Sequence, residues 1–167
     1  LLVVGTLAHV VEDQFRRLLV EMGIPEPCFL PPRRAALLPP IGPNTHFLLA
    51  QPFLSDTARA LEARGARYVA APFPLGIEGT TLWLKAAADV FGVPDARFRA
   101  VTSAPIERAR GALTPYRFQL AGKRIFFFPD SQLEVPLARF LSRELGMTLV
   151  EVGSPYLHAK LLDRELA

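Results

Sequence analysis

The fold is decided by the stretch PFPLGIEGTTLW, residues 72–83. It joins an apolar run at 68–71 to an apolar helical pattern at 82–91. The prolines lack a backbone donor and so end the first run as a strand, while Gly76 and Gly79 allow a bend that larger side chains would block. The stretch therefore predicts a turn that leads from the end of a strand to the start of a helix.

The side chains of this turn are mostly apolar. We expect Thr80 or Thr81 to cap the helix by accepting from its free N–H groups. In an open α/β sheet such a turn is where ligands bind, and an apolar turn suits a flat apolar ligand or a buried subunit contact better than a nucleotide. The alternative is that the turn only seals the core of its own lobe. The residues expected to form the wall of a substrate cavity or of an interface are Phe73, Pro74, Leu75, Gly76, Ile77, Thr80 and Trp83.

Strand and helix patterns alternate along the whole chain. Apolar runs bounded by glycine or proline predict strands, and apolar residues at spacings of three and four predict helices. The alternation is typical of βαβ units with parallel sheets, so we expect an α/β fold of Rossmann-like, three-layer αβα lobes. Strands are expected at 1–5, 28–30, 45–50, 67–71, 123–128 and 147–152, helices at 7–22, 55–64, 81–91, 95–118 and 130–145, and a helical turn at 33–38.

The helix expected at 95–118 is mostly polar and contains Pro105 and Pro115, which we expect to be faults in it. A polar helix of this length fits a connector between two lobes. The sequence therefore predicts a Rossmann-like lobe at 1–94, the connecting helix, and the opening β-α-β of a second Rossmann-like lobe at 119–167.

Two features of the second lobe can be predicted from local pattern. The run KRIFFF at 123–128 is expected to be a fully buried strand. Asp130 and Ser131 follow that strand, at the edge of the sheet where ligands bind, but helix capping is the simpler explanation for them. Ser131 and Glu134 have capping-box spacing, and Pro136 indicates that the helix begins a few residues later.

The composition is that of a globular protein. Of 167 residues, 50% are hydrophobic and 21% are charged, which provides ample core. No apolar run is long enough to span a membrane, and the buried-strand pattern that begins at Leu1 is no signal peptide. We expect the sequence to be a segment of a longer chain. Cys28 is the only cysteine, so an internal disulfide framework is excluded, the residue is expected in the core, and a reducing cytoplasm is the natural location.

The net charge of +3 is unevenly distributed. Residues 97–124 carry seven basic groups and one acid, Glu107, which leaves the remainder of the chain at −3. On a helix the basic positions wrap around the axis and form no stripe. We therefore expect a solvated or partner-facing helix and no nucleic-acid site.

Motifs that would identify a reaction are missing from the sequence. Neither nucleotide fingerprint, GxGxxG after a strand or GxxxxGK[ST], is present, and no GxSxG elbow is present. The glycines at 76 and 79 could expose N–H groups to an anion, although a capped bend explains them more simply. His9, His46 and His158 lack metal-ligand spacing. We expect neither a metal ligand nor a catalytic residue in the chain.

Four stretches together resemble a known family, the N subunits of light-independent (dark-operative) protochlorophyllide reductase within the nitrogenase component 1-like proteins. The resemblance covers essentially all 167 residues. PFPLGIEGTTLWLK and PDSQLE are its more specific parts. The four stretches are VGTLAHVVEDQF (4–15), LLAQPFLSDTARALEARGAR (48–67), APFPLGIEGTTLWLKAAADVFGV (71–93) and FFFPDSQLEVPLARFLSRELGM (126–147).

The resemblance implies an iron-sulfur oxidoreductase that acts as a complex in chlorophyll and bacteriochlorophyll biosynthesis. It implies three Rossmann-like lobes per subunit and a heterotetramer with a homologous B subunit. A [4Fe-4S] cluster would be held by three cysteines of N and a carboxylate of B, and an ATP-hydrolysing iron-sulfur protein, L, would deliver electrons that reduce the ring D double bond of protochlorophyllide to give chlorophyllide. Cys28 matches no cysteine motif of the family, so the cluster ligands are expected outside this sequence.

Two other interpretations remain open. The chain could belong to another nitrogenase component 1-like subunit, such as the Y subunit of chlorophyllide reductase or an assembly scaffold. It could also be a non-catalytic Rossmann-like module that binds a chelated metal or a small ligand.

Overall fold

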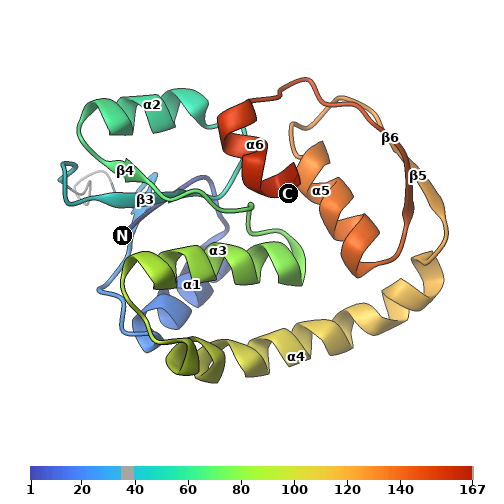
Figure 1. The fold of residues 1–167 in the computed structure, drawn as a ribbon, viewed down its shortest axis with the longest axis horizontal. Helices are drawn as coiled ribbons and strands as arrows, with labels where there is room; N and C mark the ends of the chain where they lie inside the picture. Colours follow the sequence, from blue (N-terminus) through green and yellow to red (C-terminus); the bar gives the residue numbers. More distant parts are fainter. Residues whose placement is uncertain (35–39, 167) are drawn as a thin grey trace.

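A computed structural model describes residues 1–34 and 40–166. Its first sheet is parallel and four-stranded, in the order β2-β1-β3-β4 (Figure 1). β1 lies between two neighbours, with Leu2 opposite Cys28 on one side and Phe47 on the other. The strand bounds are Leu2–Val4 for β1, Cys28–Leu30 for β2, His46–Leu49 for β3 and Arg67–Tyr68 for β4.

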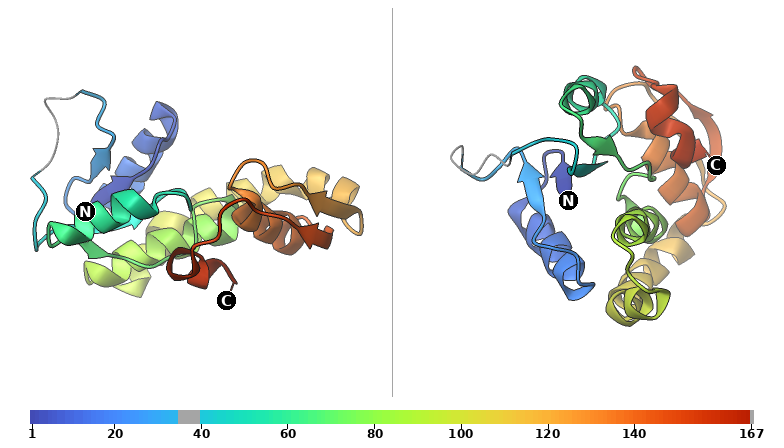
Figure 2. Two further views of the ribbon diagram at one scale, coloured as in Figure 1. Left: turned by 90° about the horizontal axis from the view of Figure 1, so that it is seen from above. Right: turned by 60° about the vertical axis from the view of Figure 1, so that its left-hand side comes forward.

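Helices cover both faces of this sheet, because successive side chains of a strand point to opposite faces. Val3 packs with Phe15 and Trp83 in one core cluster, whereas Leu2 and Val4 pack in the other. The first cluster lies under α1 (His9–Glu21) and α3 (Gly76–Val90), and the second under α2 (Ser55–Ala63) and α6 (Ala159–Leu166). The result is a three-layer αβα arrangement (Figure 2).

Helix α4 spans Asp95–Leu120 without a break. It runs along one side of the molecule from the first sheet to the second (Figure 1). Pro105 and Pro115 lie inside it, so the expectation that these prolines interrupt the helix is wrong. Each proline removes one backbone hydrogen bond from the helix, but the turns on either side continue.

The second sheet pairs β5 (Arg124–Phe127) with β6 (Thr148–Val152) in parallel. Between the strands the chain forms α5 (Glu134–Arg139), which continues as a π-helical segment, η2 (Phe140–Glu144). A fully buried β5 is contradicted, since Phe126 is 53% and Phe128 is 74% exposed. Parallel strands are normally covered on both faces, and here the described residues cover only one.

Other expectations can be compared directly with the structure. Cys28 is exposed at the edge strand β2, so its expected place in the core is wrong. α3 begins at Gly76, five residues before the expected start, and α5 begins at Glu134, as Pro136 had indicated. The helical turn at 33–38 lies largely outside the described residues. In the part of the chain that is described, no helix is long and apolar enough to cross a membrane.

Candidate functional site at the start of helix α3

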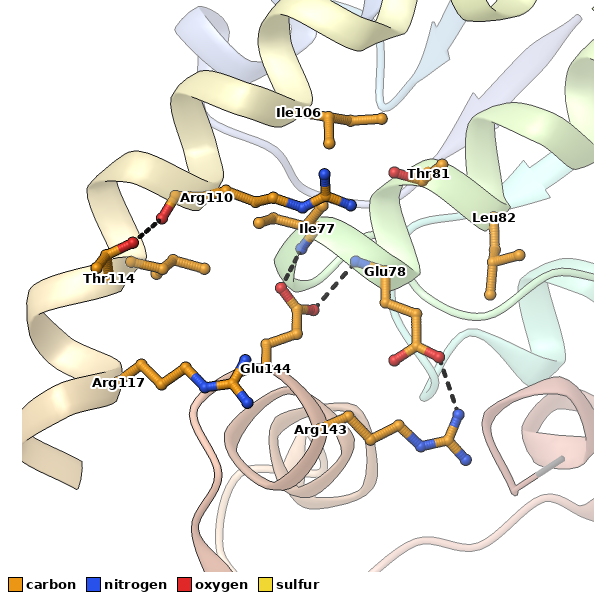
Figure 3. Close-up of a pocket in the computed structure, with 11 residues that line it drawn as sticks. Ile77, Glu78, Thr81, Leu82, Ile106, Arg110, Thr114, Arg117, Arg143 and Glu144 are labelled. Carbon is orange, nitrogen blue, oxygen red and sulfur yellow. Dashed lines mark hydrogen bonds and ion pairs between the residues drawn. The ribbon is translucent and has the colours of Figure 1, made fainter. Parts of the chain in front are cut away.

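The first turn of α3 is capped by a residue from the second half of the chain. Its N-cap residue, Leu75, has no side chain that can accept a hydrogen bond. The Glu144 carboxylate of η2 accepts from Ile77 N at 2.7 Å and from Glu78 N at 3.1 Å (Figure 3). The expected cap by Thr80 or Thr81 is therefore wrong, because both threonines lie inside the helix.

The cap occupies the N–H groups with which the glycine turn could have bound an anion. A helix start attracts negative charge because its free N–H groups and its dipole both point outward. Here those N–H groups already bind the Glu144 carboxylate. The turn is a capped bend, the simpler of the two explanations that the sequence had allowed.

A buried arginine fixes the backbone just before the helix. Arg139 of α5 donates from Nη2 to Phe73 O at 3.2 Å and to Leu75 O at 3.0 Å. Its Nε donates to Glu165 of α6 at 2.7 Å, and Glu165 also accepts from Phe73 N. Both charged side chains are almost fully buried. Because water is excluded there, each side chain neutralises the charge of the other. Two helices from the end of the chain thus hold the turn in place.

The two glycines of the turn make this close approach possible. A Cβ at Gly76 would collide with Glu144 and Phe140, and φ at this residue is +72°. A Cβ at Gly79 would collide with Arg139 and with the carbonyl of Phe73. The glycines that the sequence marked as a bend are therefore also the points where the two halves of the chain touch.

A second buried carboxylate, Glu134, holds the turn after β5. It accepts from Asp130 N at 2.9 Å and Gln132 N at 3.0 Å, from Ser131 N, and from the Ser154 hydroxyl at 3.1 Å. Burial alone raises the pKa of Glu134, but the backbone donors and the Ser154 hydroxyl together outweigh it and lower the pKa to about 2. Glu134 therefore stays ionised and organises the loop. The expected capping box is present in part: the Glu134 carboxylate accepts from Ser131 N, as a capping box requires, but α5 begins only at Glu134, and the Ser131 hydroxyl accepts from Leu133 N at 3.2 Å within the loop.

Two adjoining cavities of about 710 Å³ and about 400 Å³ lie between α3 and α4. Ile77, Thr81, Ile106 and Leu113 line both, so the two form one continuous groove. The smaller part is almost wholly apolar, with Leu84 and Ala109 in its walls. The larger part opens toward η2 and is lined by charged side chains as well.

Charged residues of three elements surround the larger cavity. Arg110 and Arg117 come from α4, and Arg143 comes from η2 (Figure 3). Arg143 pairs with Glu78 at 2.9 Å. An apolar groove with a basic rim can bind an apolar partner that carries negative charge.

The structure divides the predicted wall residues into two sets. Trp83 is fully buried, donates from Nε1 to Leu49 O at 2.8 Å and packs on Phe15, and Phe73 is buried in the other core cluster. These two seal the core. Pro74 and Leu75 are half-buried in the turn. The residues that line the groove are Gly76, Ile77 and Thr80.

Sequence reasoning missed the residues that complete the site. Arg139 and Glu144 are separated from the turn by more than 60 residues. In the sequence, the only sign of these two residues is that each places a charged side chain within the apolar helical pattern of 130–145. Arg110 and Arg117 were recognised as basic, but their placement on a groove depends on how α4 packs against α3.

Within residues 1–34 and 40–166, no three side chains of His, Cys, Asp or Glu come together as a candidate metal site. Cys28, the lone thiol, is exposed at the sheet edge.

Residues 6–167 match the family of nitrogenase component 1 type oxidoreductases. The light-independent protochlorophyllide reductase subunit N of Rhodospirillum rubrum is 67% identical over 167 residues, which are 100% of this chain and 38% of that protein. The subunit N of Bradyrhizobium sp. (strain BTAi1) is 67% identical over 168 residues, covering 100% of this chain and 39% of that protein. The chain thus spans less than half the length of these relatives.

A solved structure described as nitrogenase Cp1 at pH 6.5 aligns with 99% of this chain and 41% of its own, at a TM-score of 0.60 and 21% identity. At that identity the likeness concerns the fold alone. It confirms the α/β fold with parallel sheets that the alternating sequence pattern predicted.

Proposed function

Because the chain belongs to the family of nitrogenase component 1 type oxidoreductases, we propose that it is part of the N subunit of a light-independent protochlorophyllide reductase. The observation that carries this proposal is the 67% identity to such a subunit across the whole chain. The chain corresponds to 38% of that relative, so the activity proposed is that of a larger assembly.

The proposed reaction is the ATP-dependent reduction of one carbon–carbon double bond, in ring D of protochlorophyllide. Two electrons and two protons add across that bond to give chlorophyllide. The electrons would come from an ATP-hydrolysing iron-sulfur protein, L. The N subunit would act in a heterotetramer with a homologous B subunit, in a reducing cytoplasm.

The residues described here do not fit a [4Fe-4S] cluster. Such a cluster needs about four thiolate or equivalent ligands, whereas this part of the chain offers one exposed cysteine and no grouped metal ligands. The cluster ligands are therefore expected elsewhere in the assembly. In the proposed function, the role of this chain is to shape the subunit and to position its surfaces within the assembly.

The turn at the start of α3 supports a role in shaping the assembly. It follows the carboxyl end of a parallel strand, where α/β proteins bind ligands or partners, and Ile77 and Thr80 open onto an apolar groove. Wall residues of a pigment cavity and wall residues of a subunit interface would both have this character. The proposed function is compatible with either role, and the apolar lining and basic rim of the groove favour the interface.

Anaerobic co-purification with the partner subunits tests the function. We expect a cluster-bearing heteromer that, given the L protein, ATP and a reductant, converts protochlorophyllide to chlorophyllide, seen as a shift of the pigment absorption band. An assembled complex that reduces chlorophyllide in its place would identify the related chlorophyllide reductase. A colourless monomer without turnover would support the non-catalytic module.

A further inference from the structure

The groove between α3 and α4 is lined at helical spacing on both sides. The two helices run antiparallel, joined by the short connection at 91–94 (Figure 1). On α3 the lining positions include 77, 80, 81 and 84, and on α4 they include 102, 106, 109, 113 and 117. Steps of three and four keep residues on one face of a helix. The groove is therefore bounded by two facing helical stripes.

Along α4 the groove is long enough to hold one more helix. Its α4 side extends from Thr102 to Arg117, which is roughly 22 Å at 1.5 Å per residue. A helix of about four turns has that length, and an amphipathic helix laid in an apolar groove is a recurring mode of recognition. Small residues on the floor, such as Ala109 and Ala112, permit close approach of a helix backbone.

We propose that this groove receives an amphipathic helix from a partner subunit, whose apolar stripe is flanked by acidic residues. The inference rests on the proposed function only in that a partner subunit exists. It identifies the surface on this chain and the chemistry of what binds there.

The charge of the rim selects an acidic partner. Arg117 forms no ion pair within residues 1–34 and 40–166, and Arg110 pairs only with the exposed Glu107 of its own helix. Of the two acids that line the larger cavity, Glu144 is engaged in capping α3. Basic side chains thus remain along the α4 edge of the groove, where carboxylates of a docked helix would meet them.

The exposed residues around the groove have the composition of a protein interface. Leu82 lines the larger cavity and is 44% exposed, and Tyr116, one residue before Arg117, is 55% exposed. Tyrosine and arginine are enriched at protein–protein interfaces and among the residues that dominate binding energy. Tyr116 lies outside the cavity lining, so a polypeptide that extends beyond the groove would cover it, whereas a small ligand confined to the cavity would leave it in water.

Photo-crosslinking identifies the occupant. A photoreactive phenylalanine analogue is placed at Leu113 in the complete polypeptide, co-expressed with its partner subunits, and the crosslinked peptide is sequenced by mass spectrometry. We expect a helical segment of a different polypeptide, with apolar residues at spacings of three and four and acidic residues beside them. The same analogue at Arg99, exposed on α4 outside the groove, serves as control and should not reach that segment.

In the crosslinking experiment three results would overturn the proposal: a crosslink within the same polypeptide, a crosslink to the pigment, or no crosslink from position 113 in an assembled complex. Charge reversal provides the second arm. Arg117→Glu should weaken assembly at least tenfold without changing the melting temperature, and a Lys at the crosslinked acidic position should restore it. Arg99→Glu should assemble like the wild type.

Assembly is read out by subunit affinity and not by turnover. A complex that assembles through the groove but reduces another pigment would refute the proposed function and leave this inference standing. Normal assembly of the Arg117→Glu protein would refute the inference and leave the function standing.

Discussion

The Glu144 carboxylate accepts a hydrogen bond from the backbone N–H of Ile77 at 2.7 Å, across 67 residues of sequence. This bond ties η2 to the first turn of α3 and supplies a cap that the helix does not carry itself. The start of α3, and with it one wall of the groove, is therefore held by residues from beyond the long helix α4.

Removing this cap should destabilise the chain measurably. Glu144→Ala leaves the N–H groups of Ile77 and Glu78 without their acceptor, at a cost of about 1–2 kcal/mol in the free energy of unfolding. Glu107→Ala removes an exposed glutamate that makes one surface ion pair and should change stability by less than about 0.5 kcal/mol. Urea unfolding measures the free energy of unfolding of both variants. A loss no larger for Glu144→Ala than for Glu107→Ala would show that the cap contributes nothing.

Two glycines of neighbouring helices should respond in opposite directions to alanine. At Gly79 the new Cβ would collide with the Phe73 carbonyl and with Arg139, so the turn must shift. At Gly111, inside α4, nothing lies within 4 Å of the new Cβ, and alanine should stabilise the helix by roughly 0.5–1 kcal/mol. Thermal melting distinguishes the pair: a Gly79→Ala protein as stable as the wild type would contradict the tight contact.

The buried pair of Arg139 and Glu165 should behave as a unit. Arg139→Met leaves the Glu165 carboxylate buried without its partner and should cost about 3–5 kcal/mol. The double variant Arg139→Met, Glu165→Leu removes both charges and should lose much less than the sum of the single changes. A double-mutant cycle from urea unfolding measures this coupling, and simple additivity would disprove it.

Several elements were predictable because their signals are local. β2 was predicted at its observed bounds, 28–30, from a short apolar run stopped by prolines. The helices at 9–21 and 55–63 follow from apolar spacing with glycine at their ends. Gly76, Ile77 and Thr80 were predicted to form part of the wall of a substrate cavity or of an interface, and in the structure they line the groove.

The parts that could not be predicted depend on contacts between distant residues. The start of α3 was placed too late because its cap is Glu144, far away in sequence. The burial of the KRIFFF strand was overestimated, because Phe126 is exposed. Whether another layer covers this side chain cannot be predicted from the apolar pattern of the strand itself. The basic residues of α4 wrap the isolated helix, and only its packing beside α3 selects Arg110 and Arg117 for the groove.

The low pKa of Glu134 predicts how stability depends on acid. Its pKa is lowered from 4.5 to about 2 in the folded protein, so the stability it contributes is fully present above about pH 4.5 and is lost as the pH falls toward 2. Glu134→Gln should be less stable at neutral pH and should show a flatter loss of stability between those two values. Urea midpoints measured from pH 2 to 7 provide the comparison. Parallel curves for the two proteins would exclude Glu134 as the titrating group.

The most direct test of the proposed function is a transplant. This chain replaces the 67% identical region of the Rhodospirillum rubrum subunit N, and the chimeric subunit is purified anaerobically with its partners. The account predicts that the chimeric complex assembles and reduces protochlorophyllide to chlorophyllide at a rate within about tenfold of the unmodified complex, a span that corresponds to about 1.4 kcal/mol in the activation barrier. A chimera that assembles with its cluster intact but does not reduce protochlorophyllide would contradict it.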